Sequence, residues 1–118
     1  MRHNVKRTGL RKTKGWYKSL RKNLITQLFK HDKIKTTLGR ARTIAPIVEQ
    51  VITAVKRKED REAVRYLQTY ITEEIVAKKI LKEVREKYTT KTSGYVSVVR
   101  IGVRGGDAAP LVQIELNK

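Results

Sequence analysis

The sequence lacks the residues on which most enzyme and metal sites are built. It contains no cysteine, which excludes disulfides, thiol nucleophiles, cysteine-bound zinc and iron–sulfur clusters. Its two histidines are His3 and His31, and no serine and third group are spaced to form a triad with either. His31 beside Asp32 is weak evidence for a general base. We therefore expect no catalytic residue, no metal, no cofactor and no enzymatic activity.

Long apolar runs are also absent. None approaches the roughly 18 residues of a membrane span, so no membrane partner is expected. The glycine-rich stretch GVRGGDAAP at 102–110 lacks the Lys-Ser/Thr ending of a Walker loop. It can be a flexible connector, or its glycines can let the backbone approach a phosphate that Arg104 contacts. The pattern alone leaves both interpretations open.

Acidic residues are scarce in the first third of the chain. The 28 Lys/Arg and 11 Asp/Glu give a net charge of +17, yet residues 1–43 hold 14 of the bases and one acid, Asp32. Such a segment repels itself until an anionic partner neutralises it, and nucleic-acid phosphates can absorb many charges at once. A mitochondrial transit peptide is an alternative source of a basic, acid-poor start.

The order of periodic segments predicts the fold. Residues 1–15 have no apolar period and contain two glycines, which indicates an extended basic RNA-binding arm, followed by a single globular domain over 16–118. Helical spacing predicts a first helix at 16–30 and a second from 38 to about 57, kinked at Pro46. A short third helix starts after Glu59 or Asp60 and ends near 70, and a fourth runs from 73 to 88. Strand patterns occupy 33–37, 95–101 and 111–116. The expected fold is α+β: helix–strand–three helices–two strands, with the helices packed on one face of a small three-stranded sheet.

Polar residues before the later helices are candidate caps. Thr37 can cap the second helix, Glu59 or Asp60 the third, and Thr72 the fourth. The two predicted carboxy-terminal strands should be joined by an exposed loop, because the stretch between them is too long for a tight turn.

The first predicted helix has two different faces. Leu20, Leu24 and Leu28 form an apolar stripe, and several bases fall away from it. Tyr17 lies off the stripe and is expected to stack on a base, whereas Trp16 tops the stripe, where packing in the core is favoured over stacking. An isolated helix of this kind can bind a membrane, but here the following elements offer its apolar face a core.

Several motifs, taken in order, carry a resemblance to a known family. They are Met1-Arg2-His3, Asn23-Leu24, His31 to Thr37, Ala41 to Pro46, Ser93-Gly94-Tyr95, Arg104 to Pro110, and Ile114-Glu115-Leu116. Together they resemble the bacterial large-subunit ribosomal protein L17 family. The resemblance implies a non-enzymatic structural constituent of the large ribosomal subunit that contributes to its assembly and stability. It also implies a cytoplasmic protein, monomeric within the ribosome, whose partners are large-subunit ribosomal RNA and neighbouring large-subunit proteins.

The resemblance also implies which positions contact RNA. The expected RNA-binding residues are Arg2, His3, Lys6, Arg7, Arg11, Lys12, Lys14, Tyr17, Lys18, Arg21, Lys22, Arg40, Arg42 and Arg104. Two other hypotheses remain at this point: a DNA-binding module, which would need a recognition helix and commonly a dimer, and a small hydrolase that uses His31 and Asp32.

Overall fold

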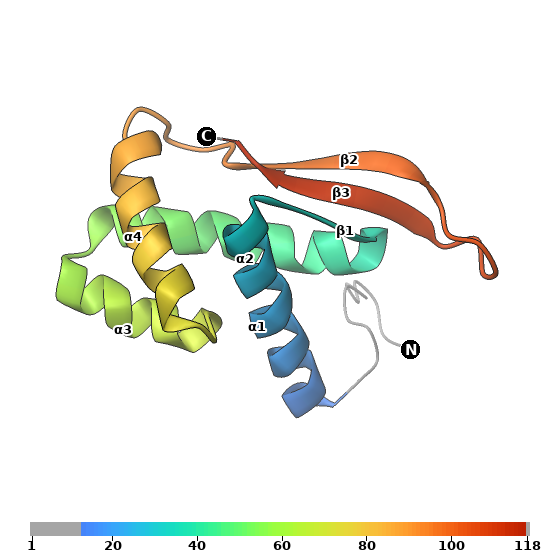
Figure 1. The fold of residues 1–118 in the computed structure, drawn as a ribbon, viewed down its shortest axis with the longest axis horizontal. Helices are drawn as coiled ribbons and strands as arrows, with labels where there is room; N and C mark the ends of the chain where they lie inside the picture. Colours follow the sequence, from blue (N-terminus) through green and yellow to red (C-terminus); the bar gives the residue numbers. More distant parts are fainter. Residues whose placement is uncertain (1–12, 118) are drawn as a thin grey trace, which may run out of the picture.

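The computed structural model describes residues 13–117, which form four α-helices and one three-stranded antiparallel sheet (Figure 1). The helices are α1 (Lys14–His31), α2 (Leu38–Arg57), α3 (Asp60–Tyr70) and α4 (Glu74–Lys87). The strands are β1 (Lys33–Thr37), β2 (Val96–Val103) and β3 (Pro110–Leu116). The predicted α+β class and element order are confirmed.

The first helix begins earlier than its periodicity indicates. The side chain of Thr13 accepts a hydrogen bond from the backbone N–H of Trp16 at 3.4 Å and so caps α1. Lys14 and Gly15, which the sequence assigned to the arm, are therefore part of the helix. Glycine lowers helix propensity, but in the first turn the cap offsets it. The expected arm over residues 1–12 lies outside the described residues.

The expected caps of the later helices are only partly correct. Thr37 and Glu59 occupy the N-cap positions of α2 and α3, but neither side chain forms a capping hydrogen bond. The N-cap of α4 is Glu73, so the assignment to Thr72 was wrong. The Thr72 N–H instead donates to the hydroxyl of Thr26 at 3.2 Å. Thr26 is buried in α1, where its oxygen needs a partner.

The sheet has the order β1-β3-β2, with β3 in the centre. Ile34 pairs with Ile114, which pairs on its other side with Val98. The ladder between β2 and β3 shifts register between Arg100 and Gly102 and continues to Val103 and Pro110. The strands are thus longer than predicted, and the connecting loop is 104–109 rather than 102–110. This hairpin extends past the helices at one end of the molecule (Figure 1).

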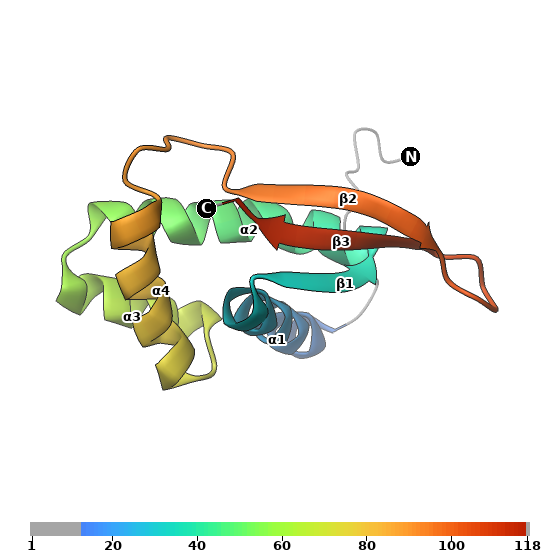
Figure 2. The ribbon, with the colours of Figure 1, turned by 45° about the horizontal axis from the view of Figure 1, so that its top comes forward.

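All four helices lie on the same side of the sheet (Figure 2). Alternation along β3 points Val112, Ile114 and Leu116 toward them, and these residues are buried. Pro46 is exposed, and α2 runs through it as one continuous helix, as predicted. The core is centred on α2, whose buried residues are Ala41, Ile44, Val48, Val51, Ile52 and Val55.

Lys79 of α4 ties that helix to the end of α1. Its ammonium donates to the carbonyl oxygens of Phe29 and Lys30 at 2.9 and 3.0 Å and lies 3.6 Å from the carboxylate of Asp32. These carbonyls are at the carboxy-terminal end of α1, where helical N–H groups no longer reach them and where the dipole favours a cation.

We expect Lys79→Met to lower the free energy of unfolding by roughly 1–2 kcal/mol, because methionine keeps the apolar stem but leaves these carbonyls without their donor. Urea unfolding at pH 7 measures the change. Lys78→Met is the matched control, since Lys78 is exposed and its one ion pair within residues 13–117 is with Glu74 on its own helix. Equal losses in the two variants would show that Lys79 does not join α4 to α1.

Tyr88 follows α4 and is 1% exposed. Its ring packs edge-on against Tyr95 with the centroids 5.4 Å apart. Within residues 13–117 its hydroxyl oxygen has no hydrogen-bond partner. Burial, and then the negative charges of Glu83 and Asp32, raise the pKa of Tyr88 to about 12.

This pKa makes stability fall at high pH. The pKa of Tyr88 in the folded state lies above the ordinary value of 10.0. The contribution of this side chain to the free energy of unfolding is therefore complete below pH 10 and is lost as pH rises toward about 12. We expect Tyr88→Phe to be as stable as the parent at pH 8 and to gain on it by roughly 2 kcal/mol at pH 11.5. Urea unfolding of both proteins at each pH tests this, and a pH-independent difference would contradict it.

Candidate nucleic-acid interface

Four bases of α1 share one side of the helix. Lys14, Lys18, Arg21 and Lys22 are spaced so that successive members are one turn or one residue apart. We call these four residues the basic strip. Two hollows lie along it, one of about 410 Å³ lined by Lys14, Tyr17, Lys18 and Arg21, and one of about 150 Å³. The second hollow is lined by Lys18, Arg21 and Lys22 together with Thr69 and Tyr70 of α3.

Tyr17 links this part of α1 to α2. Its hydroxyl lies 3.4 Å from the hydroxyl oxygen of Thr43. Since Thr43 donates its own hydrogen to the carbonyl of Gly39 at 2.9 Å, Tyr17 is the donor to Thr43. The guanidinium of Arg21 lies 5.4 Å from the centre of the Tyr17 ring. These contacts hold Tyr17 half-buried between the helices.

The two neighbouring aromatic residues differ from expectation. Trp16 is 38% exposed and is not in the core, whereas Tyr17 is the more enclosed of the two. The predicted preference for packing Trp16 in the core was wrong, because its neighbour Tyr17 occupies the side of α1 that contacts α2. Tyr17 contacts Thr43 and Arg21, and its expected stacking on a base stays a prediction.

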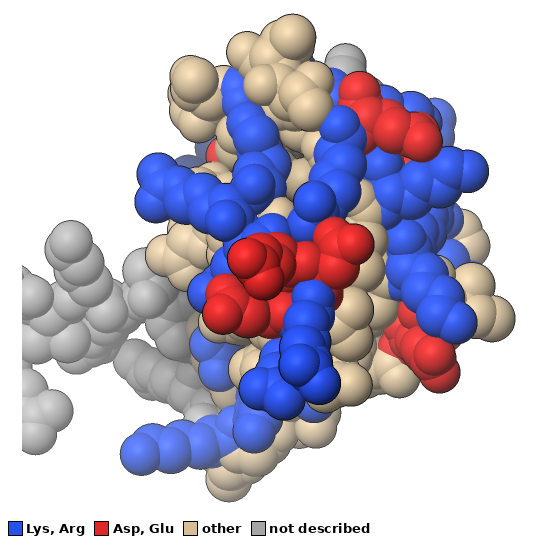
Figure 3. All heavy atoms as spheres, turned by 90° about the vertical axis from the view of Figure 1, so that its left-hand side faces the viewer, with Lys and Arg blue, Asp and Glu red and all other residues tan. Residues whose placement is uncertain are grey.

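The electrostatic environment separates the basic strip from the rest of the surface. Helix α1 contains no Asp or Glu, and within residues 13–117 no member of the strip lies in an ion pair. Most ion pairs involve α3 or α4, such as Arg85–Asp60 at 2.7 Å and Lys87–Glu83 at 3.7 Å. On the side where α3 and α4 lie, basic and acidic groups are mixed (Figure 3). The strip therefore keeps its positive charge unneutralised by the described protein.

The remaining predicted RNA contacts lie elsewhere in the fold. Arg40 is half-buried near the start of α2, and exposed Arg42 lines a different groove, between α2 and β2. Arg104 is at the tip of the β2–β3 hairpin, where it forms an ion pair with Asp107. Six further candidates lie outside the described residues: Arg2, His3, Lys6, Arg7, Arg11 and Lys12.

The hairpin loop is organised by that ion pair. The Nε–H of Arg104 donates to Asp107 at 3.1 Å, and the backbone N–H of Ala109 donates to the same carboxylate at 3.3 Å. The Arg104 hydrogen bond, followed by that from Ala109, lowers the pKa of Asp107 to about 2. Gly106 has φ of 98°, which favours glycine. Arg104 is thus engaged within a structured turn, and its expected contact with RNA stays a prediction.

No alternative chemistry emerges from the described residues. His31 is exposed at the end of α1, and Asp32 is the C-cap, with φ of 66°, paired with Lys79. Residues 13–117 contain no group of three or more His, Asp or Glu that could hold a metal. Within the same residues no helix has the length and hydropathy required to cross a bilayer.

Sequence reasoning missed two features of this surface. Thr69 and Tyr70 of α3 flank the basic strip, although nothing in their local sequence indicates this. The groove beside Arg42 was also missed, but here a signal existed. The segment Val98-Val99-Arg100-Ile101 does not alternate as a half-buried strand should.

Together these features define a small, strongly basic α+β protein with a basic strip on an acid-free helix, and with no catalytic or metal constellation among residues 13–117. Residues 20–117 match the family model described as Ribosomal protein L17. The chain therefore belongs to the ribosomal protein L17 family, and the resemblance seen in the sequence is confirmed. Proteins of this family are structural and not enzymes. The family assignment therefore takes the place of the hydrolase and DNA-binding hypotheses.

Individual relatives agree over most of their length. The large ribosomal subunit protein bL17 of Desulfitobacterium hafniense is 43% identical over 98 residues, which is 83% of this chain and 87% of the relative. The bL17 protein of Clostridium acetobutylicum is 39% identical over 99 residues, 84% of this chain and 86% of the relative. That of Neorickettsia sennetsu is 35% identical over 115 residues, 98% of both chains. As a bacterial-type ribosomal protein, the chain belongs in the cytoplasm.

Proposed function

We propose that this chain is a structural constituent of the large ribosomal subunit that binds ribosomal RNA through the basic strip of α1 and the basic arm that precedes it. The observation that carries the proposal is a set of four bases on one side of a helix without a single acid, none of which forms an ion pair within residues 13–117. The names of the relatives, large ribosomal subunit protein bL17, support ribosomal RNA as the polyanion that such a surface would meet.

The chemistry of the basic strip suits phosphate backbone rather than base edges. Lysine ammonium groups act as point charges, and the Arg21 fork can bind one phosphate with two hydrogen bonds. Arg21 is held near Tyr17, so less conformational entropy is lost when it binds. Such contacts position RNA without reading its sequence. Trp16, 38% exposed beside the strip, can add stacking with an unpaired base.

The amino-terminal end of α1 adds to this positive field. Its first turn contains no acidic residue, so the helix dipole there is not compensated within the helix. Arg40, half-buried near the start of α2, contributes further charge to the molecule. The arm would extend the same field along the RNA, and the globular part would give it a fixed origin. In this proposal the protein acts as a monomer, contacts neighbouring large-subunit proteins, and supports subunit assembly and stability.

Neutralising the basic strip should weaken RNA binding and its dependence on salt. The variant carries Lys14→Gln, Lys18→Gln, Arg21→Gln and Lys22→Gln. If each base releases counterions from one phosphate, the slope of log K against log[salt] should become shallower by about 3. Binding of the full chain to purified large-subunit RNA, measured at several salt concentrations, gives this slope.

The matched control removes the same charge from α3 and α4. Its four glutamines replace exposed bases on these two helices: Arg61, Arg65, Lys78 and Lys82. We expect the control to keep most of the affinity and slope. If both variants lose the same amount of RNA affinity and salt dependence, binding depends on overall charge and the strip is not the interface.

The same assay tests the arm. Deletion of residues 2–12 keeps Thr13 and so preserves the cap of α1. We expect the shortened chain to remain folded by circular dichroism and to lose nearly all specific RNA binding. Unchanged affinity and slope would exclude the arm from the interface.

A further inference from the structure

Strand β2 exposes much apolar surface. Val98, Val99, Ile101 and Val103 are 40%, 49%, 46% and 65% exposed. The strand is at the edge of the sheet: β3 pairs with one side, and within residues 13–117 no strand pairs with the other. An edge with free backbone groups and apolar side chains is a template for pairing with another chain, and natural proteins normally protect such edges.

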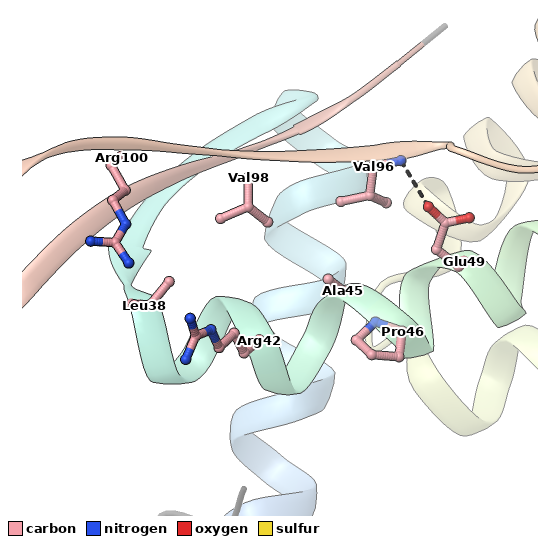
Figure 4. A pocket seen from close by; sticks show the side chains of 8 residues that line it. All are labelled: Leu38, Arg42, Ala45, Pro46, Glu49, Val96, Val98 and Arg100. Carbon is pink, nitrogen blue, oxygen red and sulfur yellow. Dashed lines mark hydrogen bonds between the residues drawn. The ribbon is translucent and has the colours of Figure 1, made fainter.

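An open groove of about 520 Å³ lies between this strand and α2 (Figure 4). Its walls are mainly apolar, formed by Leu38, Ala45, Pro46, Val96 and Val98. Glu49 stands at one end, where its carboxylate accepts a hydrogen bond from the Val96 backbone N–H at 3.1 Å. We call this feature the β2 groove.

The other end of the β2 groove is cationic. Arg42 reaches up from α2 and Arg100 reaches down from β2, so that their guanidinium groups lie on the same side of the groove (Figure 4). Both side chains are exposed, and neither forms an ion pair with any residue in 13–117. Two like charges brought together in this way favour an anion between them, and a carboxylate matches the guanidinium fork.

We propose that the β2 groove binds an extended segment of a neighbouring ribosomal protein, which adds as a strand to the free edge of β2. An apolar side chain of that segment enters the groove, and a carboxylate two residues away binds Arg42 and Arg100. The two side chains must be two apart because alternate residues of a strand face the same side. The inference rests on the proposed function, since the partner belongs to the same subunit.

Charge and shape favour this occupant over two others. A second copy would bring the Arg42–Arg100 pairs of two chains, each of net charge +17, into one interface. RNA phosphates would satisfy the arginines but leave the apolar walls of the groove, including exposed Val98, uncovered and the strand edge unpaired. An acidic–apolar protein strand satisfies the arginines, the apolar walls and the backbone edge together.

The absence of cysteine provides a direct test. Ile101→Cys introduces a unique thiol on β2, which is labelled with a benzophenone photocrosslinker. The labelled full chain is incorporated into large ribosomal subunits, irradiated, and the crosslinked product is identified by mass spectrometry. We expect the label to capture a protein segment in which an apolar residue and an acidic residue are two positions apart in the sequence. The matched control label is at Ile75→Cys on α4, a position that is 80% exposed, and it should not capture that segment.

Charge reversal tests the role of the two arginines. In the labelled chain, Arg42→Glu together with Arg100→Glu should lower the yield of this crosslink at least tenfold. The same change in charge at Arg57 and Arg61, which are exposed away from the groove, should leave the yield within twofold. Equal yields in the two variants would contradict the carboxylate contact.

The outcomes separate this inference from the proposed function. If the unlabelled chain does not co-sediment with large subunits, the proposed function fails and the inference fails with it. If the labelled chain co-sediments but crosslinks only to RNA, to a second copy or to nothing, only the inference fails. If the label itself prevents incorporation, amide hydrogen exchange of β2 in unlabelled subunits decides. Slower exchange than in the free chain supports strand addition, and unchanged exchange overturns it.

Discussion

The buried face of α2 is the constraint on which the rest of this fold depends. Residues such as Ile44, Val48 and Val55 are fully enclosed, and α2 contacts every other helix and all three strands. Burying each side chain of this kind contributes about 1.5–3 kcal/mol, so the stripe as a whole decides where the other elements must lie. The same helix positions the basic strip and the β2 groove. Helix α1 contacts α2 through Tyr17 and Thr43, and Val98 of β2 lines a groove together with residues of α2.

The distribution of charge follows from this arrangement. A net charge of +17 opposes compaction, and seven of the 11 acids that offset it are in α3, in α4 or at the N-caps of these helices, where several pair with nearby bases. The amino-terminal half of α1 has no such partners. Part of the self-repulsion therefore lies on the surface proposed to meet RNA, where binding would relieve it. This is an economical way to combine a stable body with a strongly cationic contact surface.

Local patterns predicted the elements well and their contacts less well. The period of 3.6 residues in α2 and the alternation in β3 were readable because each depends on one buried face. Thr72 was misread as a cap because the competing partner, Thr26, is 46 residues away. Trp16 was misplaced for a similar reason: its spacing continues the apolar stripe, but the contact of this end of α1 with α2 is made by Tyr17, through Thr43, which is 26 residues away in the chain.

The sequence by itself determined the absence of cysteine chemistry, the one-sided charge, the order of the elements and the family, because these are properties of composition and of short-range order. Only the tertiary structure decided that Lys79 closes the end of α1, that Arg104 is already occupied by Asp107, and that Arg42 and Arg100 meet beside an open strand edge. These features join residues distant in the chain or depend on the direction in which a side chain points. Periodicity carries no information about such contacts, which are settled when the apolar faces of separate elements pack together.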